Sequence, residues 1–486
     1  MSIKKIYFVP PFLTLVFFLL SFTQRVQQSD VLYYTFLGLS GFLAAMYVVS
    51  LFIITKRKYV PVTKTIIVKA HYVQMIMHLS IFAYWGWYWD QVYEQTILII
   101  AQLLFIHVFD ILLRWIRNET WIAGFGRVPI ILSTNLFLWF RDDWFYFQFL
   151  MIAFGVLAKD FFTWDRDDRR THIFNPSAIS LSIASTLLLL TSSTNISWGN
   201  EISNTLSYPP YIYIWIFSVG LIVQYLFHVT LVTVSTAITL LFLGAVYYHF
   251  SGVYFFYTSD IPIAVFLGLH LLVTDPVTSP KTNLGRILFG ILYALSVMIL
   301  FEILEALGAP SFYDKLLAVP LLNLCVKLLD KFARQFDFTG LTKKLFGKLL
   351  NANQLNLIHM GLWIVVFTAW YLSGHAGNSH PGRQSSFWEN ACDKNLRGGC
   401  KNLHDLISVE CDRNNALACA KLGSYYRYAR GVERDDHKAY ELVNHACELG
   451  LQEACDHLDE YRPADMKKDE SFMDTLKFFP WEGKKY

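Results

Sequence analysis

Two polar segments that contain prolines interrupt the hydrophobic part of this chain, and both carry side chains able to bind a ligand. In the first, residues 159–178, Asn175 stands before Pro176. Asparagine is a favoured N-cap and proline a favoured first-turn residue, so a helix is expected to begin there. Asp165, Asp167 and Asp168 in the same segment alternate with arginines. We interpret them as a self-neutralising loop and predict no metal site.

The second polar segment, residues 274–286, has Asp275 before Pro276 and Ser279 before Pro280. Each pair indicates the end of one helix and the start of another. Free backbone N–H groups at a helix start favour anions, and Lys281 and Arg286 would add to that preference. From the residues alone, two ordinary capped loops remain the alternative for both segments.

Histidines inside apolar runs offer a competing chemistry. His71 and His78 are seven positions apart and would share a helix face, and His107 lies in the next apolar run. Ionisable groups within a membrane are usually functional, and facing histidines can bind haem. No spacing repeats on two helices as a bis-histidine site would require, so haem is the less favoured cofactor.

The elements that must position these residues are hydrophobic helices. The chain has 486 residues, of which 54% are hydrophobic and 16% charged. About a third of the residues from Pro381 onward are charged, against about 12% of the first 380. These figures predict a polytopic membrane domain in contact with the lipid bilayer, followed by a small water-facing domain. A net charge of +3 argues against nucleic-acid binding.

Long apolar runs separated by short polar loops predict 11 to 13 membrane helices, some of them short enough to be half-helices. The runs cover residues 7–22, 31–55, 66–89, 95–115, 128–140, 144–158, 177–192, 211–227, 229–250, 260–273, 285–306, 315–329 and 354–373. The first run lacks a small-x-small cleavage site and is interpreted as a retained anchor.

The loops differ in Lys and Arg content, which predicts their side of the membrane. With Lys4 and Lys5 in the cytoplasm, the basic loops at 56–58, 159–170 and 334–348 also face inward. Thirteen crossings then place the C-terminal domain outside the cytoplasm, in the periplasm or beyond. The expected location of the chain is the inner membrane of a bacterium.

The cysteines of the tail test this placement independently. Six of the seven form pairs eight positions apart, and the second and third pairs are displaced by 36 residues: Cys392/Cys400, Cys411/Cys419 and Cys447/Cys455. A period of this size indicates stacked helical hairpins. Free thiols or metal ligands are alternatives, but zinc favours closer ligand spacing. Equally spaced pairs favour disulfides, which need an oxidising compartment. The seventh, Cys325, lies in an apolar run and is expected in the core.

The two polar segments together resemble the paired signatures of one membrane family. The strings are His172-Ile-Phe-Asn175-Pro-Ser-Ala, with Lys159 upstream, and Thr274-Asp275-Pro-x-Thr-Ser-Pro, followed by Gly285-Arg286 and Phe289-Gly290. The family contains the RnfD protein of the Rnf electron-transport complex, the NqrB protein of the Na⁺-pumping NADH:quinone oxidoreductase and related proteins from enediyne-biosynthesis clusters. The resemblance covers roughly residues 125–305.

The resemblance implies an all-α fold with two broken-helix halves, holding FMN or riboflavin and passing single electrons. By resemblance, the residues that would bind the cofactor are Lys159, His172, Asn175, Pro176, Ser177, Thr274, Asp275, Pro276, Thr278, Ser279 and Arg286. The members that work in these complexes carry FMN on the threonine of a Ser/Thr-Gly-Ala-Thr motif, which is missing here. The nearest string, residues 235–239, lacks the glycine. Any flavin is therefore expected to be non-covalent, which places the chain nearest the enediyne-associated branch.

Residues 388–462 resemble SEL-like repeats, relatives of the tetratricopeptide class, through Lys421-Leu-Gly-Ser-Tyr-Tyr and the strings that follow it up to Ala446-Cys447. In the cysteine-rich subgroup of such proteins each Cys-x7-Cys pair joins two neighbouring helices. The resemblance implies the same pairing here.

Five regions are expected: N-terminal membrane helices over 1–120, the family-like core over 121–310, further membrane segments over 311–375, repeats over 388–462 and a tail over 463–486. The favoured function is electron transfer from a cytoplasmic or quinone donor to a redox protein docked on the periplasmic repeats. A transporter on the same scaffold and a membrane-anchored scaffold for protein interactions are the alternatives. The residues do not decide whether the chain is an oxidoreductase in its own right or a component of one.

Overall fold

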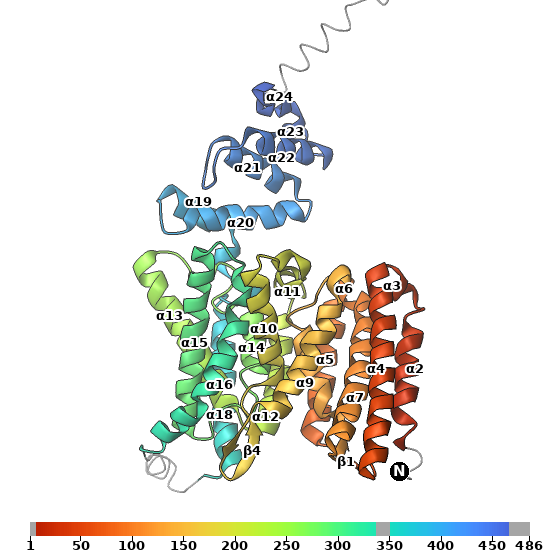
Figure 1. The fold of residues 1–486 in the computed structure, drawn as a ribbon. Helices are drawn as coiled ribbons and strands as arrows, with labels where there is room; N and C mark the ends of the chain where they lie inside the picture. Colours follow the sequence, from red (N-terminus) through yellow and green to blue (C-terminus); the bar gives the residue numbers. More distant parts are fainter. Residues whose placement is uncertain (1–5, 337–349, 466–486) are drawn as a thin grey trace, which may run out of the picture. The chain divides into compact units, whose positions relative to one another are not determined.

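The computed structural model describes residues 6–336 and 350–465, and we treat its two compact units separately (Figure 1). Unit 1 comprises residues 1–241 and 261–373, and unit 2 comprises residues 242–260 and 374–486, within the described ranges. Lys4, Lys5, most of the basic loop 334–348 and most of the predicted tail lie outside the described residues.

Unit 1 begins with helices that pack through aromatic side chains. They are α2 (Val9–Leu20), α3 (Gln24–Gln27), α4 (Asp30–Arg57), α5 (Lys69–Gly86), α6 (Gln91–Glu94) and α7 (Thr96–Arg117). Phe17 of α2 stacks on Phe36 of α4, with ring centroids 5.0 Å apart, and Phe149 of a later helix meets both rings edge-on. All three rings are fully buried, which ties this bundle to the helices that follow.

The rest of unit 1 is also helical. Its longer helices are α8 (Val128–Asn135), α9 (Tyr146–Phe161), α10 (Pro176–Leu190), α12 (Ile212–Phe227), α13 (Thr230–Ser251), α14 (Ile263–Leu271), α15 (Asn283–Ala306), α16 (Asp314–Ala333) and α18 (Ala352–Leu372), and between α10 and α12 lies the short α11 (Gly199–Thr205). The last ten residues of α13 belong to unit 2. Each apolar run marked in the sequence contains one of the helices of unit 1, so the predicted all-α membrane fold is confirmed.

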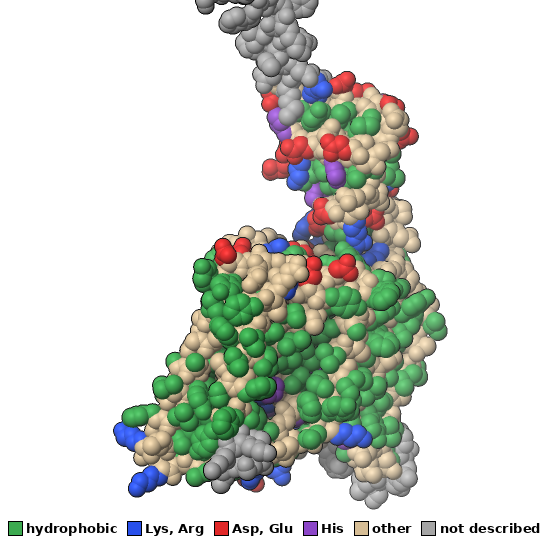
Figure 2. All heavy atoms as spheres, turned by 90° about the vertical axis from the view of Figure 1, so that its right-hand side faces the viewer, with side chains coloured by type: hydrophobic (Ala, Val, Ile, Leu, Met, Phe, Trp, Pro, Cys, Tyr) green, Lys and Arg blue, Asp and Glu red, His purple; other side chains and the backbone are tan. Residues whose placement is uncertain are grey.

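Five helices among the described residues are long and apolar enough to cross a membrane, and three shorter helices are also apolar. On the face shown in Figure 2, hydrophobic side chains cover the flank of unit 1, whereas charged side chains gather at its two ends. The chain is therefore a multi-pass membrane protein whose flank contacts lipid.

Two fully buried helices, α8 and α14, are too short to cross a bilayer. α8 has 8 residues and α14 has 9. At 1.5 Å per residue each is about 12–14 Å long, less than half of a hydrocarbon core of about 30 Å. Every residue of both helices is buried. Irregular backbone at such depths is tolerated where protein covers it, which is the broken-helix arrangement expected from the sequence.

The first polar segment holds a hairpin that the sequence did not predict. β3 (Thr163–Arg166) pairs antiparallel with β4 (Arg169–His172), and Asp167 and Asp168 form the turn with positive φ. A second, parallel pair joins β1 (Thr63–Thr65) to β2 (Trp121–Ala123). Arg- and Asp-rich sequence has low strand propensity, so the hairpin reflects tertiary contacts rather than local preference.

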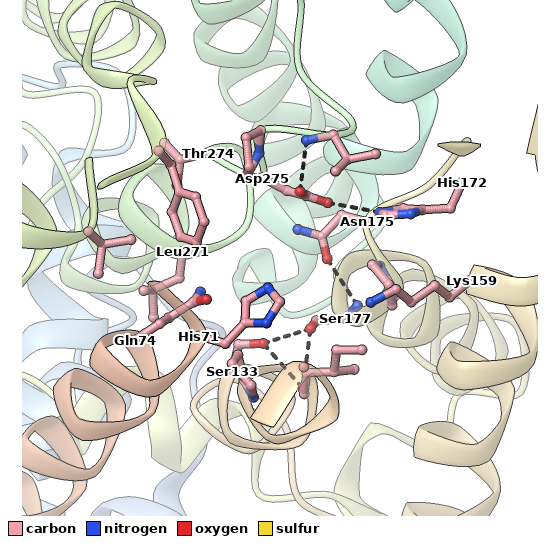
Figure 3. A pocket seen from close by; sticks show the side chains of 18 residues that line it. His71, Gln74, Ser133, Lys159, His172, Asn175, Ser177, Leu271, Thr274 and Asp275 are labelled. Atoms are coloured by element: carbon pink, nitrogen blue, oxygen red, sulfur yellow. Dashed lines mark hydrogen bonds and ion pairs between the residues drawn. The ribbon is translucent and has the colours of Figure 1, made fainter. Parts of the chain in front are cut away.

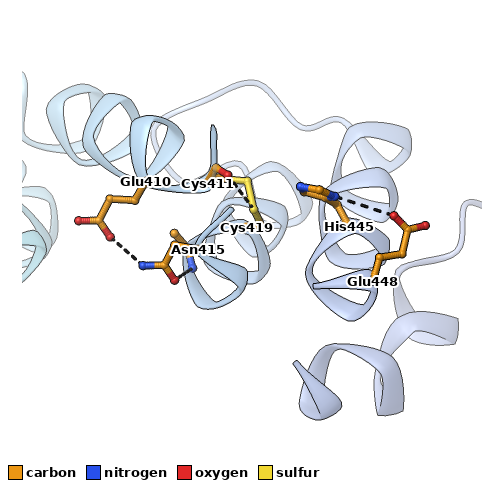
Figure 4. The surroundings of a disulfide bond; sticks show 7 residues. Glu410, Cys411, Asn415, Cys419, His445 and Glu448 are labelled. Carbon is orange, nitrogen blue, oxygen red and sulfur yellow. Dashed lines mark hydrogen bonds and ion pairs between the residues drawn. A yellow bond between two sulfur atoms is a disulfide. The ribbon is translucent and has the colours of Figure 1, made fainter. Parts of the chain in front are cut away.

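Unit 2 is built from short helices joined by disulfides. The helices are α19 (Ser385–Asp393), α20 (Gly399–Asp412), α21 (Ala416–Arg427), α22 (Asp436–Glu448), α23 (Gln452–Asp456) and α24 (Leu458–Tyr461). The bonds are Cys392–Cys400, Cys411–Cys419 and Cys447–Cys455, so the predicted pairing is confirmed. Each bond joins the end of one helix to the next helix along the chain, as Figure 4 shows for Cys411 and Cys419. Disulfides suit a domain whose hydrophobic core is small.

Candidate functional site

A partly open cavity of about 130 Å³ lies where the two short helices meet the two polar segments (Figure 3). Its walls come from α5, α8, α9, β4, α10, α12, α14 and the loop after α14. An apolar cavity of about 150 Å³ holds a benzene molecule, so this volume suits one six-membered ring.

The cavity brings together eight of the residues predicted to bind a cofactor. They are Lys159, His172, Asn175, Pro176, Ser177, Thr274, Asp275 and Pro276. Thr278, Ser279 and Arg286 do not line it. Thr278 and Ser279 donate hydrogen bonds to the side chain and the carbonyl of Asp275, and Arg286 donates to Pro280 O. These three residues hold the loop in shape.

Asn175 begins α10 in the way the sequence predicts. Its Oδ1 accepts the N–H groups of Ser177 and Ala178, at 3.0 and 3.2 Å, and Pro176 occupies the first turn. Its Nδ2 donates to Leu272 O, just beyond the end of α14. Asn175 therefore caps one helix and closes the end of another, and its amide has little capacity left for a ligand.

Asp275 is also engaged by protein groups. Its carboxylate accepts hydrogen bonds from His172 Nε2 at 3.3 Å, from Thr278 Oγ1 and from the Val277 N–H. Burial in this loop raises the pKa of Asp275, but the bond from His172 and the charge of Lys159 outweigh it. The pKa is held below its ordinary value and the carboxylate is ionised at neutral pH.

The anion site expected at the start of α15 is filled by the chain itself. The N–H groups of Lys281 and Thr282 and the Thr282 hydroxyl donate to the carboxylate of Asp330 on α16. Arg166 donates to the same carboxylate at 2.7 Å and to the carbonyls of Val277 and Ser279. Both charged side chains are about 5% exposed.

Asp167 shows that the interpretation of its loop as self-neutralising was wrong. The carboxylate pairs with Lys281 at 2.6 Å and Arg334 at 3.0 Å, neither of which belongs to the loop. These two side chains hold the pKa of Asp167 at about 2. Together with the Arg166–Asp330 pair, they fix the hairpin to the second polar segment.

Lys159 differs from its neighbours because its ammonium has no partner. It projects from the last turn of α9 into the cavity (Figure 3). Within residues 6–336 and 350–465, no side chain or carbonyl forms a hydrogen bond or ion pair with it. The nearby acids are occupied, since Asp110 and Asp160 both bind Arg127 and Arg114. A half-buried, unpaired ammonium favours a ligand that is anionic or rich in electrons.

The sequence did not assign Gln74 and Ser133 to the site, and it proposed His71 only for haem. All three line the cavity. Ser133 lies 2.6 Å from Ser177, hydroxyl to hydroxyl. The available signal was polar residues at positions 71, 74 and 78 of an apolar helix, which share one face at this spacing.

The hydroxyl groups of the nearest string, Ser235, Thr236 and Thr239, all donate to backbone carbonyls. Thr236 is fully buried, and its hydroxyl donates to Val232 O and Gly290 O. A Cβ built on Gly290 would lie 2.0 Å from Ser235 Oγ, so α13 and α15 touch there. The cavity, by contrast, offers donors suited to the oxygen and nitrogen atoms of a flavin ring, and space for the edge of that ring.

Unit 2 has its own cluster of side chains with metal-binding potential. One ligand atom each of Asp260, His375 and His380 lie within 4.8 Å of one another. Nδ1 of His380 accepts the Gly382 N–H at 3.0 Å, so in the neutral ring Nε2 carries the proton and donates to Asp260. A metal-binding histidine needs that nitrogen free and the other one protonated. The three side chains therefore form a hydrogen-bonded contact between two loops.

Comparisons with known proteins agree with the geometry. Residues 146–339 match the NQR2, RnfD, RnfE family. No curated protein and no solved structure matches the chain. The family match covers the hairpin, α10, α14 and the loop after it, but it does not include α5 or α8.

Proposed function

Because residues 146–339 match the NQR2, RnfD, RnfE family, we propose that the protein is an electron carrier of a membrane complex and binds a non-covalent flavin, with one edge of its ring in the cavity. The family match supports a role in a membrane electron-transport complex. We propose in addition that the bound cofactor is a flavin, either FMN or riboflavin.

The unpaired ammonium of Lys159 is the observation that carries the flavin assignment. When bound, a flavin supplies one-electron and two-electron redox chemistry. Lys159 would donate a hydrogen bond to the ring edge on which negative charge gathers, and would counter that charge in a site of low dielectric constant. The Asp275–His172 pair would fix the loop behind that edge without contacting the ring.

The apolar part of the lining would reduce the contact of the ring edge with water. Val223, Phe227 and Leu271 supply the apolar part of the lining. Apolar side chains beside the polar groups would strengthen electrostatic interactions at the ring edge and limit side reactions of a reduced carrier with solvent.

We also propose that unit 2 is a SEL-like repeat domain on the periplasmic side of a bacterial inner membrane, where it binds a redox protein partner. The three disulfides support an oxidising compartment. Stacked helical hairpins present extended protein-binding surfaces, which supports the partner role. A quinone is a candidate donor.

The test of the flavin is the content of the purified full-length protein. We expect the visible absorbance of a flavin, released as FMN or riboflavin on denaturation. Lys159→Met should release much less. A colourless preparation that binds no added riboflavin and takes up a solute in proteoliposomes would overturn the proposal in favour of a transporter.

The test of the compartment is thiol labelling in intact cells. We expect the six tail cysteines to stay unlabelled until a reductant is added. Labelling of all six without a reductant would contradict the periplasmic placement.

A further inference from the structure

The polar atoms around the cavity fall into two groups, according to whether the protein satisfies them. His172, Asn175, Ser177, Ser133 and Asp275 all form hydrogen bonds with protein groups. His71, Gln74 and Lys159 line the same cavity, and no described residue forms a hydrogen bond with their side chains. Polar groups inside a protein are normally satisfied, so these three are the groups left for a ligand.

Two of the three unsatisfied groups come from outside the family region. His71 and Gln74 lie on α5, whereas the family match begins at residue 146. Figure 3 shows them on one helix, directed across the cavity toward the side that carries Lys159 and Asn175. The ligand would thus lie between two walls. The family-type wall carries Lys159, Asn175 and Asp275 and lies in the matched region. The α5 wall carries His71 and Gln74 and belongs to the N-terminal helices.

The first turn of α5 is held in place by local contacts. β1 pairs with β2 just before α5, and the rings of Tyr72 and Phe125 are 5.7 Å apart. A Cβ on Gly126 would lie 3.4 Å from His71 Nδ1, so the imidazole lies close to Gly126. His71 is thereby positioned without using its nitrogen atoms.

The polar face of α5 continues one turn further. His78 is fully buried, and neither of its ring nitrogens has a partner among the described residues. Residues 71, 74 and 78 follow the i, i+3, i+7 spacing of one helix face. The face turned toward lipid is different, because Ile76 and Leu79 are exposed. The polar face is therefore directed into the protein.

On the basis of the proposed function, we propose that His71 and Gln74 bind the pyrimidine edge of the flavin together with Lys159, and so set ligand specificity. That edge presents a carbonyl, an imide N–H and a second carbonyl. A glutamine amide offers one acceptor and one donor side by side, which matches the imide N–H and an adjacent carbonyl. Lys159 donates to the other carbonyl, and His71 binds a remaining ring nitrogen or oxygen. The cavity volume of about 130 Å³ accepts this single ring.

The experiment combines a change in the protein with a change in the ligand. Full-length protein is stripped of bound flavin, and the affinities for riboflavin and for riboflavin methylated on the imide nitrogen are measured by fluorescence quenching. Wild type should bind the methylated ligand at least about tenfold more weakly, because the Gln74 carbonyl loses its donor. In Gln74→Leu that ratio should fall toward one. His71→Leu should weaken both ligands about equally.

Ile76→Ala is the matched control, since it changes the same helix on its lipid side and should keep the wild-type ratio. The thermal midpoints of ligand-free Gln74→Leu and His71→Leu should equal that of wild type, which separates binding from folding. Wild-type riboflavin binding with an unchanged ratio in Gln74→Leu would overturn this inference and leave the proposed function standing. Wild-type protein that binds no flavin at all would overturn both.

Discussion

The two walls of the cavity differ in how their polar atoms are used. On the family-type wall, Asn175 and Asp275 cap helices and close a loop, and each is saturated by protein partners. On the α5 side, His71 and Gln74 have no such partners among the residues described. Motif residues that are easy to recognise can therefore build the shape of a site while less recognisable ones contact the ligand. Substitutions should separate the two roles: Asn175 and Asp275 should affect stability, whereas His71, Gln74 and Lys159 should affect binding.

The largest loss of stability is expected at the buried Arg166–Asp330 ion pair, behind the family-type wall. Arg166→Ala or Asp330→Ala would each leave a buried charge without its partner, which costs about 3–5 kcal/mol. The loop carbonyls and N–H groups that the pair binds would lose their partners too. Thermal unfolding of the purified protein in detergent measures the loss.

Arg169→Ala, in the same hairpin but exposed, is the control for these substitutions. The double variant Arg166→Met/Asp330→Leu should be less destabilised than either single variant, because no lone charge remains. A single variant as stable as wild type would show that the pair does not support this wall.

An intermediate effect is expected at the cap of α10. Asn175→Ala should lower the free energy of unfolding by about 1–2 kcal/mol, because two backbone N–H groups and Leu272 O lose their partners. Asn175→Asp keeps the acceptor of the cap and should recover most of the loss. If Asn175→Ala lowered flavin affinity with no change in stability, the comparison of the walls would be reversed.

A smaller change in stability, opposite in sign, is expected when Lys159 is replaced. In ligand-free protein, Lys159→Met should leave the thermal midpoint equal to wild type or higher, because it removes a half-buried ammonium that lacks a partner. The same substitution should weaken flavin binding. A lower midpoint in the ligand-free variant would mean that Lys159 contributes to the fold.

The smallest effect is expected at the exposed turn of the hairpin. Asp167→Asn should stay within about 0.5 kcal/mol of wild type, since its partners are solvent-exposed. The pKa of Asp167 is lowered to about 2, so its contribution is complete above its unfolded pKa of 3.8 and is lost as the pH falls through about 2. Stability differences between variant and wild type should therefore not vary from pH 5 to pH 8.

Local signals in the sequence predicted much of this structure. Hydrophobic runs, the Asn175-Pro176 pair and the cysteine spacing each depend on residues close together in the chain, and the helices, the cap and the disulfides followed. Long-range partners could not be predicted. Asp330 fills the N-terminus of α15 from 49 positions beyond Lys281, and Asp167 binds Arg334. Gln74 was missed because only the assembled cavity shows which polar groups lack partners.

Gly124 does not line the cavity, but it lies against the segment that leads into α5. A Cβ at this position would lie 2.3 Å from Ile66 O, so any side chain must push apart the strands that precede α5 and α8. Larger residues at Gly124 should thus displace the segment that leads into α5, and with it His71. Substitution of Gly124, a residue outside the cavity, would then change which ligands the cavity accepts.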